Sequence, residues 1–164
     1  MKLKGKALKY GDNIDTDVII PGKYTKTLNM KELADHVMED LDPDFKNKLQ
    51  NGDFLVAGHN FGCGSSREQA PLALKHAGVS CIIAESFARI FYRNAINIGL
   101  PLIECKIDEI KNGDILEYVV GSSKLHNLTT QKIIEVKPLP QIMTSILKEG
   151  GLVNYLKKYG CYKL

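Results

Sequence analysis

Apolar and polar positions in the middle of the chain follow two periods, one typical of strands and one of a helix. A short apolar run at 54–57 predicts a strand, and a near-continuous apolar run at 79–84 predicts a strand buried on both faces. Between them, from Ala70 to Ala77, apolar side chains recur at the i, i+3, i+4 and i+7 spacing of one helix face. A strand, a helix and a strand in this order predict a parallel βαβ unit.

The same periods extend the prediction along the chain. Further strands are predicted at 3–9, 101–104, 115–120 and 132–136, a turn at 121–124, and further helices at 30–41, 87–98, 139–147 and 152–159. Ser86 is the predicted N-cap of the second of these helices. Asp15 and Asp17 alternate with apolar neighbours, so they point the same way if their segment is extended. We predict an α/β fold, with a small mixed sheet flanked by helices, and one domain over 1–164.

Composition and charge exclude several classes of protein. The 164 residues carry a formal net charge of +3, which is too small to indicate binding to nucleic acid. No apolar run approaches the roughly 20 residues that span a membrane. The N-terminal stretch Met1–Lys6 lacks the apolar region of a signal peptide. We therefore expect a cytoplasmic protein that binds neither nucleic acid nor a membrane.

The four cysteines, Cys63, Cys81, Cys105 and Cys161, show no metal-binding spacing. They form no Cys-x-x-Cys pair, and no paired histidine motif accompanies them. Cys81 and Cys105 lie in apolar, strand-like runs and are expected in the core, whereas Cys63 lies beside two serines. We expect reduced thiols and no metal held by this chain alone, because an iron–sulfur cluster needs three or four cysteines in one neighbourhood.

A glycine-rich turn follows the strand at 54–57. Gly58, Gly62 and Gly64 allow the backbone to turn sharply and to approach a ligand closely. A strand, such a turn and a helix start predict an anion-binding corner, because free N–H groups and the positive end of the helix dipole meet there.

Serines and a proline mark the start of the helix after this turn. Ser65 with Glu68, and Ser66 with Gln69, fit the Ser-x-x-Glu/Gln capping box. Pro71 has no N–H and is favoured at the first helical position. We therefore predict that the helix proper starts at this proline, after a capped turn.

Two interpretations of this corner remain open from the residues alone. A serine hydroxyl acts as a base or nucleophile only if its alkoxide is stabilised, here by turn N–H groups, the helix dipole and Arg67. The guanidinium of Arg67 can also hold a carboxylate by two parallel hydrogen bonds. In the other interpretation the serines only cap the helix and Arg67 only makes an ion pair.

Three motifs resemble those of the aconitase superfamily. They are Asp-Asn-Ile-Asp-Thr-Asp at 12–17, Asn-Phe-Gly-Cys-Gly-Ser-Ser-Arg-Glu at 60–68, and Ser-Phe-Ala-Arg-Ile-Phe-Tyr-Arg-Asn-Ala at 86–95. The resemblance runs from about Leu8 to about Cys105, and the length and motif order are similar to those of 3-isopropylmalate dehydratase small subunits. It implies the swivelling β/β/α domain that aconitase has at its C-terminal end.

The resemblance implies a hydro-lyase whose active site is shared between two subunits. Ser65, as an alkoxide, takes the proton beside a carboxylate, and Asp17 pairs with a histidine of the larger subunit. Ser66 and Arg67 bind the carboxylate. The serine oxygen is supported by the backbone of Gly62, Cys63 and Gly64. The 4Fe-4S cluster that binds the departing hydroxyl belongs to the large subunit, with which this chain forms a heterodimer or heterotetramer.

The resemblance also implies a small dicarboxylate or tricarboxylate substrate. In the family a loop that often has the sequence Tyr-Leu-x-Thr discriminates between substrates, and this chain has Tyr-Thr-Lys-Thr at 24–27. Leu28 suits the alkyl group of 2- and 3-isopropylmalate, which the family interconverts in leucine biosynthesis. Thr25 and Lys26 suit a further carboxylate, as in homoaconitase, or lie in solvent.

Two alternatives stay open at this point. The first is the small subunit of a homoaconitase or of a 2,3-dimethylmalate dehydratase. The second, from a different class, is a non-catalytic module that binds small anions at the central turn.

Overall fold

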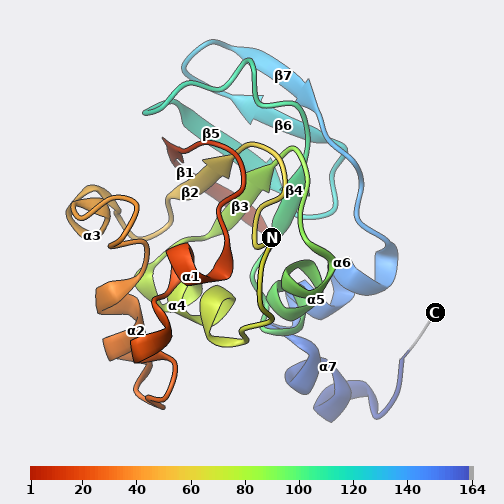
Figure 1. Ribbon diagram of the computed structural model, residues 1–164. Coiled ribbons are helices and arrows are strands. Elements are labelled where there is room, and N and C mark those ends of the chain that lie inside the picture. Colours follow the sequence, from red (N-terminus) through yellow and green to blue (C-terminus); the bar gives the residue numbers. More distant parts are fainter. Residues whose placement is uncertain (163–164) are drawn as a thin grey trace.

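Seven strands form one mixed sheet at the centre of the molecule (Figure 1). A computed structural model describes residues 1–162, so the last two residues of the predicted domain, 163 and 164, lie outside the described part. The strand order is β4-β3-β2-β1-β5-β6-β7. The strands are β1 (Lys2–Lys9), β2 (Phe54–Ala57), β3 (Cys81–Ala84), β4 (Leu102–Glu104), β5 (Ile115–Val119), β6 (Lys124–Asn127) and β7 (Lys132–Glu135). The mixed sheet confirms the predicted α/β class.

The sheet has a parallel half and an antiparallel half, which meet at β1. Strands β1 to β4 are all parallel to one another, whereas β5, β6 and β7 pair antiparallel. The helices are α1 (Thr16–Ile19), α2 (Met30–His36), α3 (Phe45–Lys48), α4 (Gln69–Ala77), α5 (Arg89–Asn97), α6 (Gln141–Lys148) and α7 (Leu152–Tyr159), with a 3₁₀-helix η1 at Gly22–Tyr24. The predicted βαβ unit is therefore β2-α4-β3, and β3-α5-β4 repeats it.

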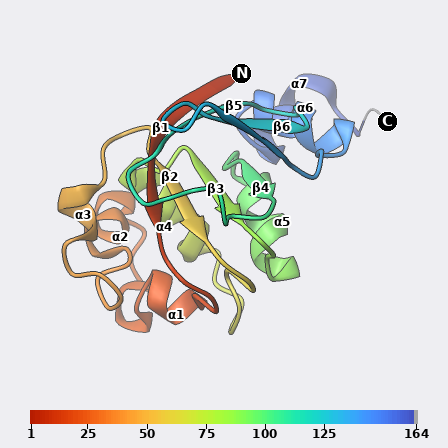
Figure 2. The same cartoon turned by 90° about the horizontal axis from the view of Figure 1, so that it is seen from above.

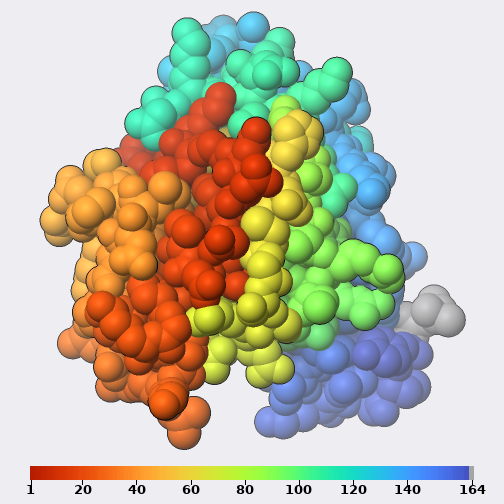
Figure 3. Space-filling model, in the orientation of Figure 1, coloured from red at the N-terminus to blue at the C-terminus, as the bar shows by residue number. Residues whose placement is uncertain are grey.

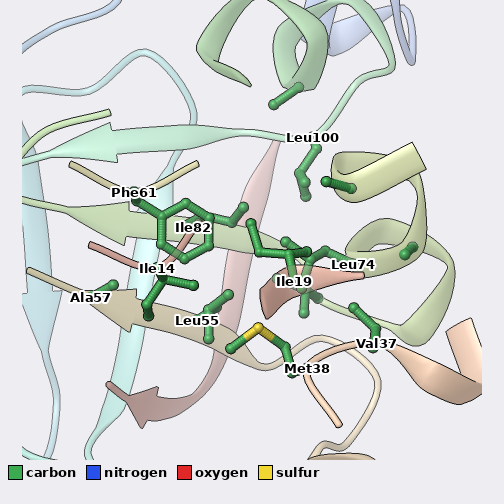
Figure 4. Packing of buried hydrophobic residues seen from close by; sticks show 14 of the residues in the cluster. Ile14, Ile19, Val37, Met38, Leu55, Ala57, Phe61, Leu74, Ile82 and Leu100 are labelled. Carbon is green, nitrogen blue, oxygen red and sulfur yellow. The ribbon is translucent and has the colours of Figure 1, made fainter. Parts of the chain in front are cut away.

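Each face of the sheet has its own hydrophobic core. Because successive strand residues point to opposite faces, Leu55 and Ile82 belong to one core and Val56 and Ile83 to the other. Figure 4 shows the first core, in which residues of α1, α4 and the strands converge. Figure 2 shows α1, α2 and α4 on one side of the sheet and α6 and α7 on the other. Burial on both faces explains the near-continuous apolar runs of the central strands.

One local prediction on the N-terminal side is wrong because a tertiary hydrogen bond overrides the local pattern. The helix predicted to reach residue 41 ends at His36, since Met38 has a positive φ of 61° and donates its N–H to the Ile19 carbonyl at 2.8 Å. The condition under which Asp15 and Asp17 would point the same way, an extended segment, is not met: the segment forms α1, whose N-cap Asp15 accepts a hydrogen bond from the Val18 N–H at 2.8 Å. Asp15 and Asp17 are therefore not aligned as in a strand.

Two further predictions need correction. Ser86 does not cap α5, which begins at Arg89, and its hydroxyl oxygen instead accepts from the Asn60 N–H at 2.8 Å. Strand β6 lies where the sequence predicts only a turn and a loop. The strand pattern is not recognisable there, because one of its two buried positions is Leu125 but the other is a polar residue, Asn127. Among the described residues, no helix is long and apolar enough to cross a membrane.

Asn127 is fully buried and links the antiparallel half to the loop before β5. Its amide nitrogen donates to a carboxylate oxygen of buried Asp114 at 2.7 Å and to the Glu109 carbonyl at 3.1 Å. Its amide oxygen accepts from the N–H groups of Thr129 and Thr130. One side chain therefore satisfies four polar groups in a low-dielectric setting.

We predict that Asn127→Ala lowers the free energy of unfolding by about 1–3 kcal/mol, because it leaves the buried Asp114 carboxylate short of a donor. Urea unfolding followed by circular dichroism measures the change. Asn97→Ala is the control, since Asn97 is exposed on α5 and should change stability little. Equal losses for the two variants would contradict the structural role of Asn127.

Candidate active site

The glycine-rich segment after β2 is held between two other segments by backbone hydrogen bonds. On one side the Gly62 N–H donates to the Ile14 carbonyl at 2.8 Å, and the Thr16 N–H donates to the Cys63 carbonyl at 2.9 Å. On the other side Phe61 exchanges two hydrogen bonds with the backbone of residues 86–88. Figure 3 shows this segment as a yellow band between the red N-terminal segment and the green segment of α5. Its backbone position is therefore fixed from both sides.

Glycine is required where this segment passes other groups closely. Gly62 has a φ of +81°, and a Cβ at this position would overlap the ring of Phe91. A Cβ at Gly58 would overlap the carboxylate of Asp12, which accepts a hydrogen bond from the His59 N–H at 2.7 Å. The glycines predicted from the sequence thus allow close packing of the turn against α5 and against the segment after β1.

Both serines of the turn are exposed, and neither caps α4. The N-cap of α4 is Glu68, with no side-chain hydrogen bond, so both predicted capping boxes are wrong. The helix begins at Gln69, so the predicted start at Pro71 is two residues too late. Pro71 has no N–H for the Arg67 carbonyl, which instead accepts from the Ala70 N–H at 3.3 Å. The serine hydroxyls are therefore available to other groups.

The backbone of the turn offers a row of free donors. The N–H groups of residues 63–67 donate to no acceptor among residues 1–162. The carbonyl of Ser65 accepts from the Thr16 hydroxyl at 2.6 Å, which fixes the peptide that follows it. Free N–H groups just before a helix N-terminus favour a negative charge, so these donors are arranged as an anion-binding corner requires.

Arg67 and Asp17, which the sequence places 50 positions apart, form an ion pair. The side chain of Arg67 is mostly buried, with 22% exposed, and its guanidinium lies against the backbone of Gly22. The side chain of Asp17 is 62% exposed. A mostly buried arginine needs an anionic partner, and in this chain the carboxylate of Asp17 provides one.

A hollow of about 290 Å³ opens beside this ion pair. Its lining joins the turn to the first turns of α5, with Ser66, Arg67, Arg89 and Asn94 as polar members. Its other lining residues are Thr16, Gly62, Gly64, Ala88, Ile90 and Phe91. Arg89 lies in the third sequence motif, at 86–95, which does not by itself assign it to the site. Its place in the hollow depends on the packing of α5 against the turn, which no local pattern reveals.

Comparisons with known proteins show the family of the chain. Residues 1–107 match the family model described as the aconitase C-terminal domain. The chain belongs to the aconitase family.

Relatives in this family are similar over nearly their whole length. The 3-isopropylmalate dehydratase small subunit of Caldanaerobacter subterraneus is 57% identical, with 95% of this chain and 98% of the relative covered. The 3-isopropylmalate dehydratase small subunit 2 of Archaeoglobus fulgidus is 59% identical over the full length of both chains. The methanogen homoaconitase small subunit of Methanothermobacter thermautotrophicus is 56% identical, with 95% and 91% covered.

A crystal structure of 3-isopropylmalate dehydratase from Methanocaldococcus jannaschii has the same fold. It superposes with a TM-score of 0.93 at 51% identity, covering 98% of this chain and 96% of the other. The predicted swivelling-domain fold is therefore confirmed, and the chain is a dehydratase (hydro-lyase) small subunit of the aconitase family. This places it among enzymes, and not among non-catalytic anion-binding modules.

The loop at residues 24–28, to which the family resemblance assigns substrate discrimination, does not line the hollow. The Gln69 side-chain amide donates to the Thr25 carbonyl at 3.0 Å, so the loop is tied to the first turn of α4. Lys26 is exposed, and Leu28 is 93% exposed. None of Thr25, Lys26 and Leu28 lines the hollow in the described chain. The Thr25 hydroxyl donates to the Gly22 carbonyl at 2.7 Å, so only Lys26 and Leu28 project into solvent.

The cysteines of this aconitase-family chain are spread over four different places. Cys81 is buried, Cys63 and Cys105 are half-buried and Cys161 is exposed. Burial raises the pKa of Cys105 to about 12, with a further contribution from Glu85, and raises the pKa of Cys81 well above its ordinary value. Within residues 1–162, no three histidine, cysteine or acidic side chains gather in a metal-binding arrangement. This set of donors does not fit an iron–sulfur cluster.

We predict that Gly62→Ala destabilises the protein more than Gly113→Ala does. Both positions have a positive φ, +81° and +92°, which costs about 1–3 kcal/mol in backbone strain for alanine. Only Gly62 faces a ring, Phe91, so it adds an overpacking cost of about 1–3 kcal/mol.

Nothing lies within 4 Å of a Cβ at Gly113, which makes it a matched control for strain alone. Thermal unfolding of both variants gives the comparison. Equal stability losses would contradict the close packing of Gly62 against Phe91 of α5.

Proposed function

We propose that this chain supplies half of the active site of a 3-isopropylmalate dehydratase. With a large subunit it would interconvert 2-isopropylmalate and 3-isopropylmalate, by removing and re-adding water, in leucine biosynthesis. The observation that supports this most strongly is the hollow that joins an exposed serine turn with free N–H groups to the guanidinium of Arg67. The names of the relatives support the substrate class.

Ser65 is the proposed base. Its hydroxyl is exposed at a turn whose free backbone N–H groups, from Cys63 through Gly64 to Arg67, would stabilise a negative oxygen. The backbone from Gly62 onward is fixed by neighbouring segments, so these donors are in place before a substrate arrives. As an alkoxide, Ser65 would take the proton from the carbon next to a carboxylate of the substrate.

Arg67 and Ser66 are the proposed carboxylate ligands. Both line the hollow, and a guanidinium can hold a carboxylate by two parallel hydrogen bonds. In the free chain, the Arg67 guanidinium forms an ion pair with the Asp17 carboxylate. In the complex, a substrate carboxylate would replace it and leave the exposed Asp17 to pair with a histidine of the large subunit, the role that the family resemblance implies.

The other half of the site is proposed to come from a large subunit. The relatives are named small subunits, which supports such a partner. The 4Fe-4S cluster of that partner would supply a Lewis-acidic iron for the departing hydroxyl. The chain itself would be a single domain over 1–164 that binds the substrate, positions the base and excludes water. A cytoplasmic heterodimer or heterotetramer is the proposed form.

A homoaconitase small subunit is the second candidate. One relative at 56% identity has the name of a methanogen homoaconitase small subunit. Exposed Lys26, next to the site and without an ion-pair partner among residues 1–162, suits the extra carboxylate of such a substrate. Exposed Leu28 suits the alkyl group of isopropylmalate or of 2,3-dimethylmalate instead. Turnover of these three substrates, two dicarboxylates and one tricarboxylate, by one purified complex distinguishes the candidates.

We predict that Ser65→Ala lowers kcat by about 10²–10⁴-fold, because the proton transfer loses its base. The measurement is the interconversion of 2- and 3-isopropylmalate by the chain and its cluster-bearing large subunit, followed by NMR. Assembly, measured by size-exclusion chromatography, should persist since Ser65 is exposed and its side chain makes no hydrogen bond within residues 1–162.

Ser123→Ala is the control for this variant. Ser123 is exposed in the turn before β6, far along the chain from the hollow, and its replacement should leave kcat unchanged. A Ser65→Ala complex with near-normal turnover would eliminate the base role. A wild-type complex that converts none of the tested substrates would refute the proposed reaction itself.

We predict that Arg67→Lys raises KM by about tenfold or more, because an ammonium group cannot form the two parallel hydrogen bonds of a guanidinium. Lysine keeps the charge that pairs with Asp17, so the fold should survive. Steady-state kinetics of the reconstituted complex test this, and an unchanged KM would remove Arg67 from substrate binding.

A further inference from the structure

A second cavity, of about 320 Å³, lies on the other side of the N-terminal end of α5. It is formed between α5 and the segment that leads into α6, two elements that pack together in the fold (Figure 1). Its body is apolar and consists of Phe87, Tyr92, Pro138, Leu139, Pro140 and Met143. An apolar cavity of this size accommodates one large side chain or a small ligand.

The rim of this cavity is strongly cationic. Arg89, Arg93 and Lys137 line it, against the single carboxylate of Glu104. Lys137 pairs with Glu104 at 3.2 Å, so that charge is compensated. Arg89 and Arg93 are exposed at i and i+4 on α5, and neither has an acidic partner within residues 1–162. The rim therefore presents two uncompensated guanidinium groups to whatever covers it.

The second cavity is adjacent to the candidate active site. Arg89 belongs to the walls of both cavities, so they lie side by side at the start of α5. Ile90, the next residue, lines the active-site hollow and is 53% exposed. An exposed isoleucine in the wall of one cavity, next in the chain to an arginine that lines both, is typical of a protein–protein contact, whose centre is rich in apolar side chains and arginine.

We propose that this cationic cavity is a docking point for the large subunit, which inserts an apolar side chain into the cavity and sets acidic residues against Arg89 and Arg93. The inference rests on the proposed function, because it extends the shared active site along α5. A free small carboxylate would fill the cavity but leave Ile90 in water. Only a macromolecular partner covers the isoleucine and both guanidinium groups together.

The test is the affinity of the chain for the purified, cluster-bearing large subunit from the same organism. Arg93→Glu is the informative variant, because Arg93 lines only the second cavity and lies outside the candidate active site. We expect the Kd of this variant for the large subunit to rise about 10- to 100-fold. The Kd should also depend less on salt concentration, because an attractive charge pair is lost. At saturating chain concentration the kcat of the complex should match that of the wild type.

Lys124→Glu is the matched control. Lys124 is exposed on β6, in the antiparallel half of the sheet and away from α5, and its reversal changes net charge by the same amount. Its Kd should stay within twofold of the wild-type value. Equal Kd values for Arg93→Glu and the wild type, or equal losses for both variants, would overturn the docking inference.

Two further outcomes separate the inference from its alternatives. Titration of the chain alone with 4-methylpentanoate should give no binding that depends on Arg93, and such binding would make the cavity a small-molecule site and overturn the proposal. A wild-type complex that assembles through Arg93 but has no lyase activity would refute the proposed function and leave the docking point standing. Failure of the wild-type chain to associate would overturn both.

Discussion

The candidate active site depends on one backbone arrangement, in which the segment after β2 is held between residues 14–16 and 86–88. Four main-chain hydrogen bonds made by Phe61, Gly62 and Cys63 or their partners define it. Because β2 is a central strand, the segment leaves the sheet in its middle and must run between neighbours on both sides. Gly62 makes this possible, since a side chain there would collide with Phe91. The three sequence motifs of the family thus correspond to three segments that hold one another.

This arrangement explains which parts of the structure follow from the sequence. Strands such as β2 and β3 are recognisable because both faces are buried, so Leu55 and Val56 are both apolar. The helix around Ala73 is recognisable because its apolar stripe has the helical period. Strand β6 is not, because its alternating buried positions include Asn127, a polar residue whose amide nitrogen finds its acceptors in Asp114 and Glu109, on another segment.

The candidate site is likewise only partly recognisable from the sequence. The turn with Ser65 and Arg67 is evident from glycine spacing and the family motifs, since its residues are neighbours in the chain. The Asp17–Arg67 ion pair and the entry of Arg89 into the hollow are not evident, because each depends on how separate segments pack. The early end of α2 has the same origin: the amide of Met38 finds an acceptor in Ile19 that the local pattern does not contain.

The meeting of parallel and antiparallel halves at β1 has a consequence for the chain as a unit. The family model ends at residue 107, before β5 begins, so the part it matches has β1 as its outermost strand. In the full chain, β5 pairs with β1 from Lys2–Val119 to Lys6–Ile115 and covers that margin. A fragment cut at 107 would present unpaired main-chain donors and acceptors there, which invite other chains to add a strand and aggregate. The C-terminal third therefore covers the exposed edge of the part that contains the candidate active site.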